Sequence, residues 1–245
     1  MARSDTVNWI KQPSTSAICS WLNQNMPITF GSYRISDLKK TGLVIIDMVN
    51  GFCTLRAGKL APTKQDPHME QVIKNVNILA GEFAKRKMEI LSFEDCHRQD
   101  HPEHPYPLHC LAGSNESKLI PELEWLYEYT SGHIQKDCIN PYIGGEQYGD
   151  VNEFMRWLWN NGIENLVICG VCTDICVLDF VSIATSLRTH AGMGVNIQDV
   201  VVCMLGCSTF DSPEHPRAIC QYMGLYQMAA RGATLADSII FPNPN

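Results

Sequence analysis

Short apolar runs that alternate with helical patterns are the feature that most constrains this fold. Strand-length runs such as 43–46 and 166–169 contain no polar residue, which is typical of strands buried on both faces. Between two such runs, residues 69–87 place Val72, Val76 and Phe83 on one helical face. This alternation predicts an α/β domain with an open, mostly parallel sheet and helices on both faces. We expect six strands, at residues 43–48, 88–93, 133–136, 166–169, 199–204 and 238–241.

Length, charge and cysteine usage narrow the class of protein. A chain of 245 residues can build one α/β core, and we expect an N-terminal extension at 1–40 followed by one domain at 41–245. The net charge of −7 argues against nucleic acid or an anionic membrane as partner. No apolar run approaches the ~20 residues of a membrane span. The 11 cysteines follow no secretory signal, which favours free thiols and a cytoplasmic protein. Aromatic residues in the extension could dock onto a partner subunit, so we also expect a homo-oligomer.

The stretch 166–177 contains a position suited to a cysteine nucleophile. Gly170 ends the apolar run, Thr173 and Asp174 supply helix-start chemistry, and a helical pattern follows from 175 to 187. Cys176 would then lie in the first turn of a helix, where backbone N–H groups and the helix dipole favour a thiolate. The same N–H groups could hold a developing oxyanion. The alternative interpretation is a small buried hydrophobe, the commoner fate of a free cysteine.

Charged residues at strand ends point to one site. Asp47 interrupts an apolar run near its carboxyl end, and burial there would raise its pKa, which suits a general base. Lys136 ends another predicted strand, although a lone lysine in such a place is usually solvated. Because ligands bind at the carboxyl ends of parallel strands, we expect Asp47, Asp95, Lys136 and Cys176 to lie close together.

Residues 94–110 have the composition of a metal-binding loop. Asp95 and His97 would point to the same side of a strand end, and three prolines stiffen the path that returns His109. Imidazole with carboxylate suits zinc, iron or manganese, and three protein ligands leave positions open for water and substrate. The alternative is a solvated polar loop with fortuitous histidines. His101 and His104 also lie in this stretch.

The segment 170–177, Gly-Val-Cys-Thr-Asp-Ile-Cys-Val, resembles the nucleophile motif of the isochorismatase-like cysteine hydrolases, in their nicotinamidase/pyrazinamidase branch. Residues 47–53 and 136–140 look most similar to plant-type nicotinamidases. The resemblance implies a Rossmann-like three-layer fold with Cys176, not Cys172, as the nucleophile. It also implies a cis peptide at Val171–Cys172, with the backbone N–H groups of Cys172 and Cys176 as oxyanion donors.

The same resemblance assigns the other site residues. It implies Asp47 as the base, Lys136 as an essential cation and Phe52 as a wall of the substrate pocket. Asn50 matches the family pattern, whereas Val49 and Gly51 stand where relatives often have Gln and Asp. The implied metal ligands are Asp95, His97 and His109, with Glu103 as a further candidate and Tyr106 at an aromatic substrate-binding position. One divalent transition-metal ion is expected, zinc first, with iron or manganese as alternatives. His101 and His104 have no family counterpart, so we expect them on the surface.

The implied reaction is hydrolysis of nicotinamide to nicotinate and ammonia through a thioacyl-enzyme, a step of NAD salvage. A first alternative is a sister amidohydrolase for a ureido or carbamoyl amide, a group that generally lacks the metal histidines. A second alternative is a catalytically silent relative used for binding. The complete set of Asp47, Lys136 and Cys176 argues against the silent relative.

Overall fold

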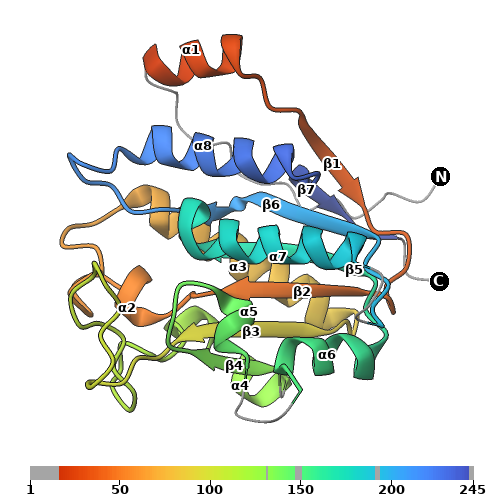
Figure 1. Cartoon of the computed structure of the whole chain (residues 1–245), viewed down its shortest axis with the longest axis horizontal. Helices are drawn as coiled ribbons and strands as arrows, with labels where there is room; N and C mark the ends of the chain where they lie inside the picture. Colours follow the sequence, from red (N-terminus) through yellow and green to blue (C-terminus); the bar gives the residue numbers. More distant parts are fainter. Residues whose placement is uncertain (1–16, 131, 147–150, 191–193, 243–245) are drawn as a thin grey trace.

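The computed structural model of the chain describes residues 17–130, 132–146, 151–190 and 194–242. Its described residues form a seven-stranded sheet in the order β1-β7-β6-β5-β2-β3-β4, and every strand pairing is parallel (Figure 1). The strands are β1 (Phe30–Arg34), β2 (Thr41–Ile46), β3 (Ile90–Asp95), β4 (His133–Lys136), β5 (Asn165–Val171), β6 (Asp199–Ser208) and β7 (Thr234–Ile240). Strands β2, β3 and β5 are buried along their whole length, as their apolar runs predict.

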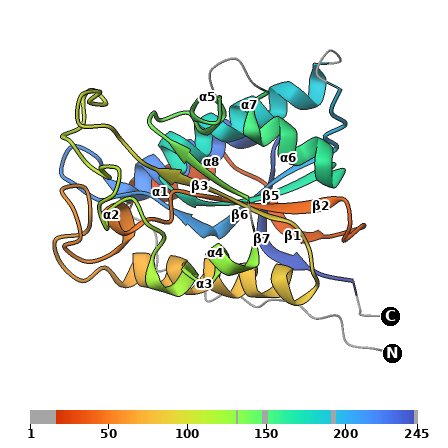
Figure 2. The same ribbon diagram turned by 90° about the horizontal axis from the view of Figure 1, so that it is seen from below.

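Helices cover both faces of the sheet, which confirms the three-layer α/β fold. Helix α3 lies on one face, while α7 and α8 lie on the other (Figure 2). The longer helices are α1 (Ala17–Asn25), α3 (Pro67–Lys85), α6 (Glu153–Asn161), α7 (Leu178–Thr189) and α8 (Arg217–Ala230). The short ones are α2 (Asn50–Cys53), η1 (Pro121–Leu123), α4 (Leu126–Tyr129), α5 (Pro141–Gly144) and the π-helical turn η2 (Thr173–Val177). Within the described residues, no helix has both the length and the apolar character needed to cross a membrane.

The sheet has seven strands and not the six predicted, because β1 was missed. Its residues are mostly exposed, so they show neither an apolar run nor a buried alternation. Backbone pairing with β7 holds β1 in place instead, and the Tyr33 hydroxyl donates a hydrogen bond to Asp199 at 2.7 Å. Directly after β1, Ile35 is buried and its N–H bonds the carbonyl of Ile240. In the N-terminal extension, Trp9 and Ile10 lie outside the described residues.

Two predicted helices differ in the structure. Residues 119–129 look like one helix in the sequence, but the chain forms the 3₁₀ turn η1 and then the single-turn α4. At 173, the Thr hydroxyl does not cap a helix. It donates instead to the side-chain oxygen of Gln221 at 2.7 Å, which ties the turn η2 to α8. Tertiary contacts therefore override local capping chemistry at this point.

Candidate active site

The register of four neighbouring strands brings the predicted site residues together. Ile46 lies opposite Phe93 of β3 and Gly170 of β5, so these three strands end at one level. Asp95, the last residue of β3, lies directly opposite Lys136, the last residue of β4. The carboxyl ends of β5, β2, β3 and β4 thus form one edge, as expected for a ligand site in a parallel sheet.

Lys136 is the centre of the site. Its ammonium group donates hydrogen bonds to Oδ1 of Asp95 at 2.7 Å, to the carbonyl of Cys138 at 3.1 Å and to the sulfur of Cys176 at 3.8 Å. The same nitrogen lies 2.9 Å from Oδ2 of Asp47. The lysine is buried, and the negative groups around it raise its pKa well above the ordinary value against the effect of burial. Lys136 is therefore a permanent cation and not the solvated lysine of the alternative interpretation.

Asp47 has the properties of a general base. It is fully buried, and its backbone adopts a left-handed φ of 53° directly after β2. Burial raises the pKa of its carboxyl to about 7, although Lys136 acts to lower it. Oδ2 is engaged by the Lys136 ammonium, whereas Oδ1 is buried and has no hydrogen-bond partner within the described residues. Asp47 is thus poised near neutral pH with one oxygen available to accept a proton.

Cys176 lies in the turn η2, and its surroundings favour the neutral thiol over the thiolate. Burial raises the pKa of this thiol well above its ordinary value, and the nearby Lys136 lowers it only in part. The side chain is 8% exposed, so little water remains to stabilise a free negative charge. The thiol is neutral at rest and needs a base to become a nucleophile.

The backbone before the nucleophile has the expected conformation. The peptide bond between Val171 and Cys172 is cis. The carbonyl of Cys172 accepts from the N–H groups of Ile175 and Val177, both at 3.1 Å. At Gly170, φ is 129° and a Cβ atom would collide with the backbone of Ile46 in the adjacent strand. Glycine is required there because β5 passes so closely to the strand that carries Asp47.

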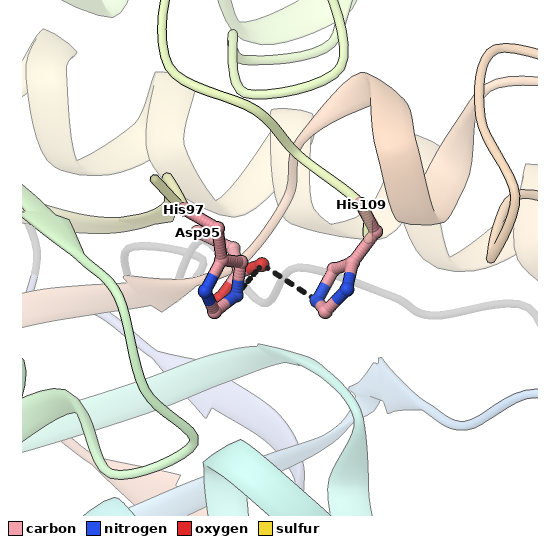
Figure 3. Close-up of side chains that lie close together, drawn as sticks. All are labelled: Asp95, His97 and His109. Atoms are coloured by element: carbon pink, nitrogen blue, oxygen red, sulfur yellow. Dashed lines mark ion pairs between the residues drawn. The ribbon is translucent and has the colours of Figure 1, made fainter. Parts of the chain in front are cut away.

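Asp95, His97 and His109 form a compact buried cluster, which we call the candidate metal centre (Figure 3). The Nε2 atoms of His97 and His109 lie 2.9 Å and 3.1 Å from Oδ2 of Asp95. The Nδ1 atom of His109 lies 2.7 Å from the carbonyl of Pro107. Because a carbonyl only accepts, Nδ1 carries the hydrogen and Nε2 faces the cluster. A backbone carbonyl that holds the other ring nitrogen in this way is common for metal-bound histidines.

The donor atoms of this centre fit a metal ion better than a hydrogen-bonded cluster. Oδ2 of Asp95 and both ring nitrogens of His97 have no hydrogen-bond partner within the described part of the chain. All three side chains are at most 2% exposed, so water cannot satisfy these atoms. One carboxylate and two imidazoles that converge without hydrogen bonds are the O and N donors that zinc, iron or manganese takes.

The remaining predicted residues flank this centre. Glu103 Oε2 lies 3.8 Å from Nε2 of His97 and 3.7 Å from Nε2 of His109, close enough for these atoms to face a common ion. The ring centroids of Phe52 and Tyr106 lie 5.6 Å and 6.1 Å from that of His109. These two rings can wall a flat substrate beside the cluster. His101 and His104 are exposed, in agreement with the prediction.

Two contributions to the site were not predicted. The Asn50 side chain donates to the carbonyls of Asn115 and Leu119, both at 3.1 Å, and so fixes the turn after Asp47 against a distant loop. The carbonyl of Cys138 accepts from Lys136 and helps to aim it. The sequence signalled Asn50 through the family pattern, but a backbone acceptor such as Cys138 leaves no mark in a sequence.

Comparison with known proteins identifies the family. The family model described as the isochorismatase domain matches residues 41–238. The chain belongs to the isochorismatase family. Nicotinamidase 1 of Arabidopsis thaliana is 42% identical over 212 residues, which cover 82% of this chain and 86% of that relative.

Solved structures of family members share the fold. The nicotinamidase PncA from Bacillus subtilis superimposes with a TM-score of 0.63 at 23% identity, over 81% of this chain and 99% of that one. The pyrazinamidase of Pyrococcus horikoshii in complex with zinc gives a TM-score of 0.58 at 19% identity, over 80% of this chain and 98% of that one. At these identities the likeness establishes the architecture of this isochorismatase-family chain, while the substrate has to be argued from the site.

Proposed function

We propose that this protein is a nicotinamidase that hydrolyses nicotinamide to nicotinate and ammonia. The observation that carries the proposal is the direct contact of one cation, Lys136, with Asp47 and Cys176 on one side and with Asp95 of the candidate metal centre on the other. Sister amidohydrolases for carbamoyl amides generally lack the metal histidines, whereas His97 and His109 are here buried and convergent. The similarity to a curated nicotinamidase supports the same substrate.

The geometry supplies each proton transfer of a cysteine amidase. Asp47 takes the proton of the neutral Cys176 thiol, and the thiolate attacks the amide carbon while Lys136 stabilises the negative charge. The N–H groups of Cys172 and Cys176 hold the oxyanion. As the C–N bond breaks, Asp47 gives its proton to the departing ammonia. Asp47 then deprotonates a water molecule that attacks the thioester, and it returns that proton to the departing Cys176 sulfur. The acid product loses its own proton to solvent and leaves as nicotinate.

The cofactor in this proposal is one divalent transition-metal ion, zinc first, with iron or manganese as alternatives. Asp95, His97 and His109 would hold it, with Glu103 joining directly or through water. Such an ion would bind the pyridine nitrogen of the substrate and withdraw electrons from the ring. Phe52 and Tyr106 would position that ring between them.

A test separates this proposal from the carbamoyl-amide alternative. Full-length enzyme of measured metal content should release ammonia from nicotinamide and not from an N-carbamoyl amino acid. Cys176→Ala should abolish turnover while nicotinamide still binds, whereas Cys172→Ala should retain much of the activity because only its N–H is used. Release from the carbamoyl compound alone, or an active Cys176→Ala variant, would contradict the proposal.

We further propose that the enzyme works in the cytoplasm as a homo-oligomer in NAD salvage. The ten described cysteines form no disulfide, which suits a reducing compartment. Trp21 of α1 and Phe30 of β1 are more than half exposed and offer an apolar surface for a second copy. Light scattering on the purified chain measures the assembly, and a monomeric mass would contradict it.

A further inference from the structure

A second group of metal-ligating side chains lies outside the candidate metal centre. Asp174 belongs to the turn η2, His215 to the loop between β6 and α8, and Cys220 to the first turn of α8. One ligand atom of each lies within 4.8 Å of the others, and all three residues are partly buried. We propose that these three residues, called here the second cluster, bind a divalent metal ion of the zinc type, separate from the catalytic one.

The contacts of His215 aim its Nε2 atom at the Asp174 carboxylate. Its Nδ1 lies 3.1 Å from the backbone carbonyl of Phe210, which can only accept, so Nδ1 carries a hydrogen. Its Nε2 lies 2.7 Å from Oδ2 of Asp174. A lone pair on Nε2 would repel the carboxylate at that distance, so a proton or a metal ion must lie between them. A backbone carbonyl on the other ring nitrogen is the usual second-shell partner of a metal-bound histidine.

Asp174 and Cys220 add the other donors. Oδ1 of Asp174 is buried and has no hydrogen-bond partner in the described part of the chain, although buried carboxylate oxygens normally have one. Gly224 packs so tightly on Asp174 that a Cβ atom there would lie 2.9 Å from the Asp174 Cα. Cys220 precedes Gly224 by four residues and therefore lies on the same face of α8. Close packing of the helix thus turns the thiol toward the carboxylate.

The donor set selects the kind of ion. One thiolate, one imidazole and one carboxylate suit zinc better than magnesium or calcium, which prefer oxygen ligands. Zinc–ligand bonds of about 2.0 Å would widen the Asp174–His215 contact to about 3.3 Å in a tetrahedral site. The side chains of Asp174 and His215 are 16% and 18% exposed, so an ion can enter from solvent and water can complete the coordination. An ion here would tie the β6–α8 loop to the turn that carries Cys176.

Cobalt provides a probe that distinguishes the two centres. The ligands assigned to the catalytic ion contain no sulfur, so a sulfur-to-cobalt charge-transfer band in the near ultraviolet reports a thiolate ligand. Full-length protein, stripped with a chelator and titrated with Co²⁺, should bind two equivalents per chain and show this band. Cys220→Ser and His215→Gln should each bind one equivalent, and Cys220→Ser should lose the band. Cys138→Ser, a partly buried cysteine outside the second cluster, is the matched control and should keep both equivalents and the band.

The glutamine variant also distinguishes a metal ion from a proton. Its amide can still donate to Asp174, as a protonated His215 would, but it is a poor ligand for zinc. One equivalent without a thiolate band in the wild-type protein would show that a proton lies between His215 and Asp174, and would overturn the proposal. A band that persists in Cys220→Ser would do the same, because another thiol would then be the ligand.

Discussion

At the residue scale, one buried cation serves two carboxylates and one thiol. Lys136 forms ion pairs with both Asp47 and Asp95, so its charge is needed before any substrate arrives. Burial separates the protonation states of the triad: the Asp47 carboxyl has a pKa of about 7 and the pKa of the Cys176 thiol lies far above its ordinary value. The proton can therefore move from sulfur to carboxylate only when attack on the substrate stabilises the thiolate.

Replacing the lysine should cost stability as well as activity. Lys136→Met leaves buried Asp47 and Asp95 without their counter-charge, and breaking such a buried pair lowers the free energy of unfolding by about 3–5 kcal/mol. Urea unfolding at neutral pH measures this loss. Lys118→Met, at an exposed lysine, is the control and should change stability by less than about 0.5 kcal/mol. Equal midpoints for the two variants would show that the ion pairs contribute nothing net.

The pKa of Asp47 sets the pH dependence of the reaction. The carboxylate must be deprotonated to accept the thiol proton, so kcat/KM for nicotinamide should rise with pH up to about 7 and then level off. Below that value we expect roughly a tenfold fall per pH unit. Steady-state rates across the acid limb measure it. A limb that falls only near pH 4, the ordinary range of an aspartate, would show that burial does not tune this base.

The convergence of the candidate site residues could be predicted from the sequence, but their protonation states could not. Asp47, Lys136 and Cys176 each follow a strand, and parallel topology alone brings strand ends together. The raised thiol pKa depends on how completely the surrounding elements exclude water from Cys176, and no local pattern records that. The second cluster was missed because Asp174, His215 and Cys220 meet only when α8 packs on η2.

At the scale of elements, close strand contact positions the base. β5 passes β2 so closely at Gly170 that any side chain would strike the backbone of Ile46, the residue before Asp47. Long apolar strands were predictable because a buried strand shows in the sequence as an uninterrupted apolar run. β1 and the short helices η1 and α4 were not, because backbone pairing and tertiary contacts hold them in place of a periodic pattern.

Gly170→Ala should therefore move Asp47. We expect the free energy of unfolding to fall by about 3 kcal/mol or more, because of overpacking and an unfavourable φ for alanine. We also expect a large fall in kcat. Thermal unfolding and ammonia release measure the two effects. Gly81→Ala, in a helix and open to a Cβ atom, is the control and should be neutral or slightly stabilising. A fully active Gly170→Ala protein would show that the strands can separate without cost.

A pH-dependent contact joins the starts of two helices. Asp66 caps α3 by accepting from the N–H groups of His68 and Met69, and it also pairs with Arg217 at the start of α8. Burial would raise the pKa of Asp66, but Arg217 and the helix N–H groups hold it below its ordinary value. A depressed pKa stabilises the fold above the ordinary value, near 4, and this contribution is lost as the pH falls through the folded-state value.

Asp66→Asn separates the cap from the ion pair. Asparagine still caps the helix but cannot pair with Arg217, so the variant should be about 1 kcal/mol less stable than wild type at neutral pH. At pH values where the wild-type carboxyl is itself protonated, the two proteins should be equally stable. Urea midpoints at several pH values measure the difference from wild type. Asp100→Asn, at an exposed pair with Arg98, should show no measurable difference at any pH. A difference independent of pH for Asp66→Asn would assign the effect to packing.

At the scale of the whole molecule, the segment before residue 41 completes the sheet without reaching the site. β1 covers the edge of β7, and Leu22 and Ile35 are buried against the domain. The family match begins at residue 41, and the lowest-numbered triad residue is Asp47. The segment before residue 41 thus contributes to the sheet and the core, while the residues of the candidate site all lie after it.

Removal of residues 1–40 should lower stability and leave the chemistry intact. Loss of the buried Leu22 and Ile35 side chains costs at least about 3 kcal/mol, or roughly 6–12 °C in Tm. The open β7 edge should also promote aggregation. Calorimetry and the kcat of the soluble fraction measure both effects. Tyr33→Phe loses only the hydrogen bond to Asp199, so its free energy of unfolding should fall by about 1 kcal/mol or less. A large loss of kcat in the folded, truncated protein would show that residues before 41 are needed for catalysis.

The position of Lys136 on the outermost strand has a consequence for how this enzyme can change. In the described sheet, β4 has four residues and pairs with β3 alone, so backbone hydrogen bonds hold it on one side only. A cavity of about 1040 Å³, lined in part by His133 and Gln135, lies along this strand. Substitutions at this rim can alter how firmly the catalytic cation is held without touching any residue that meets the substrate. Directed evolution of the catalytic rate should therefore include the neighbours of Lys136 along β4 as well as the pocket itself.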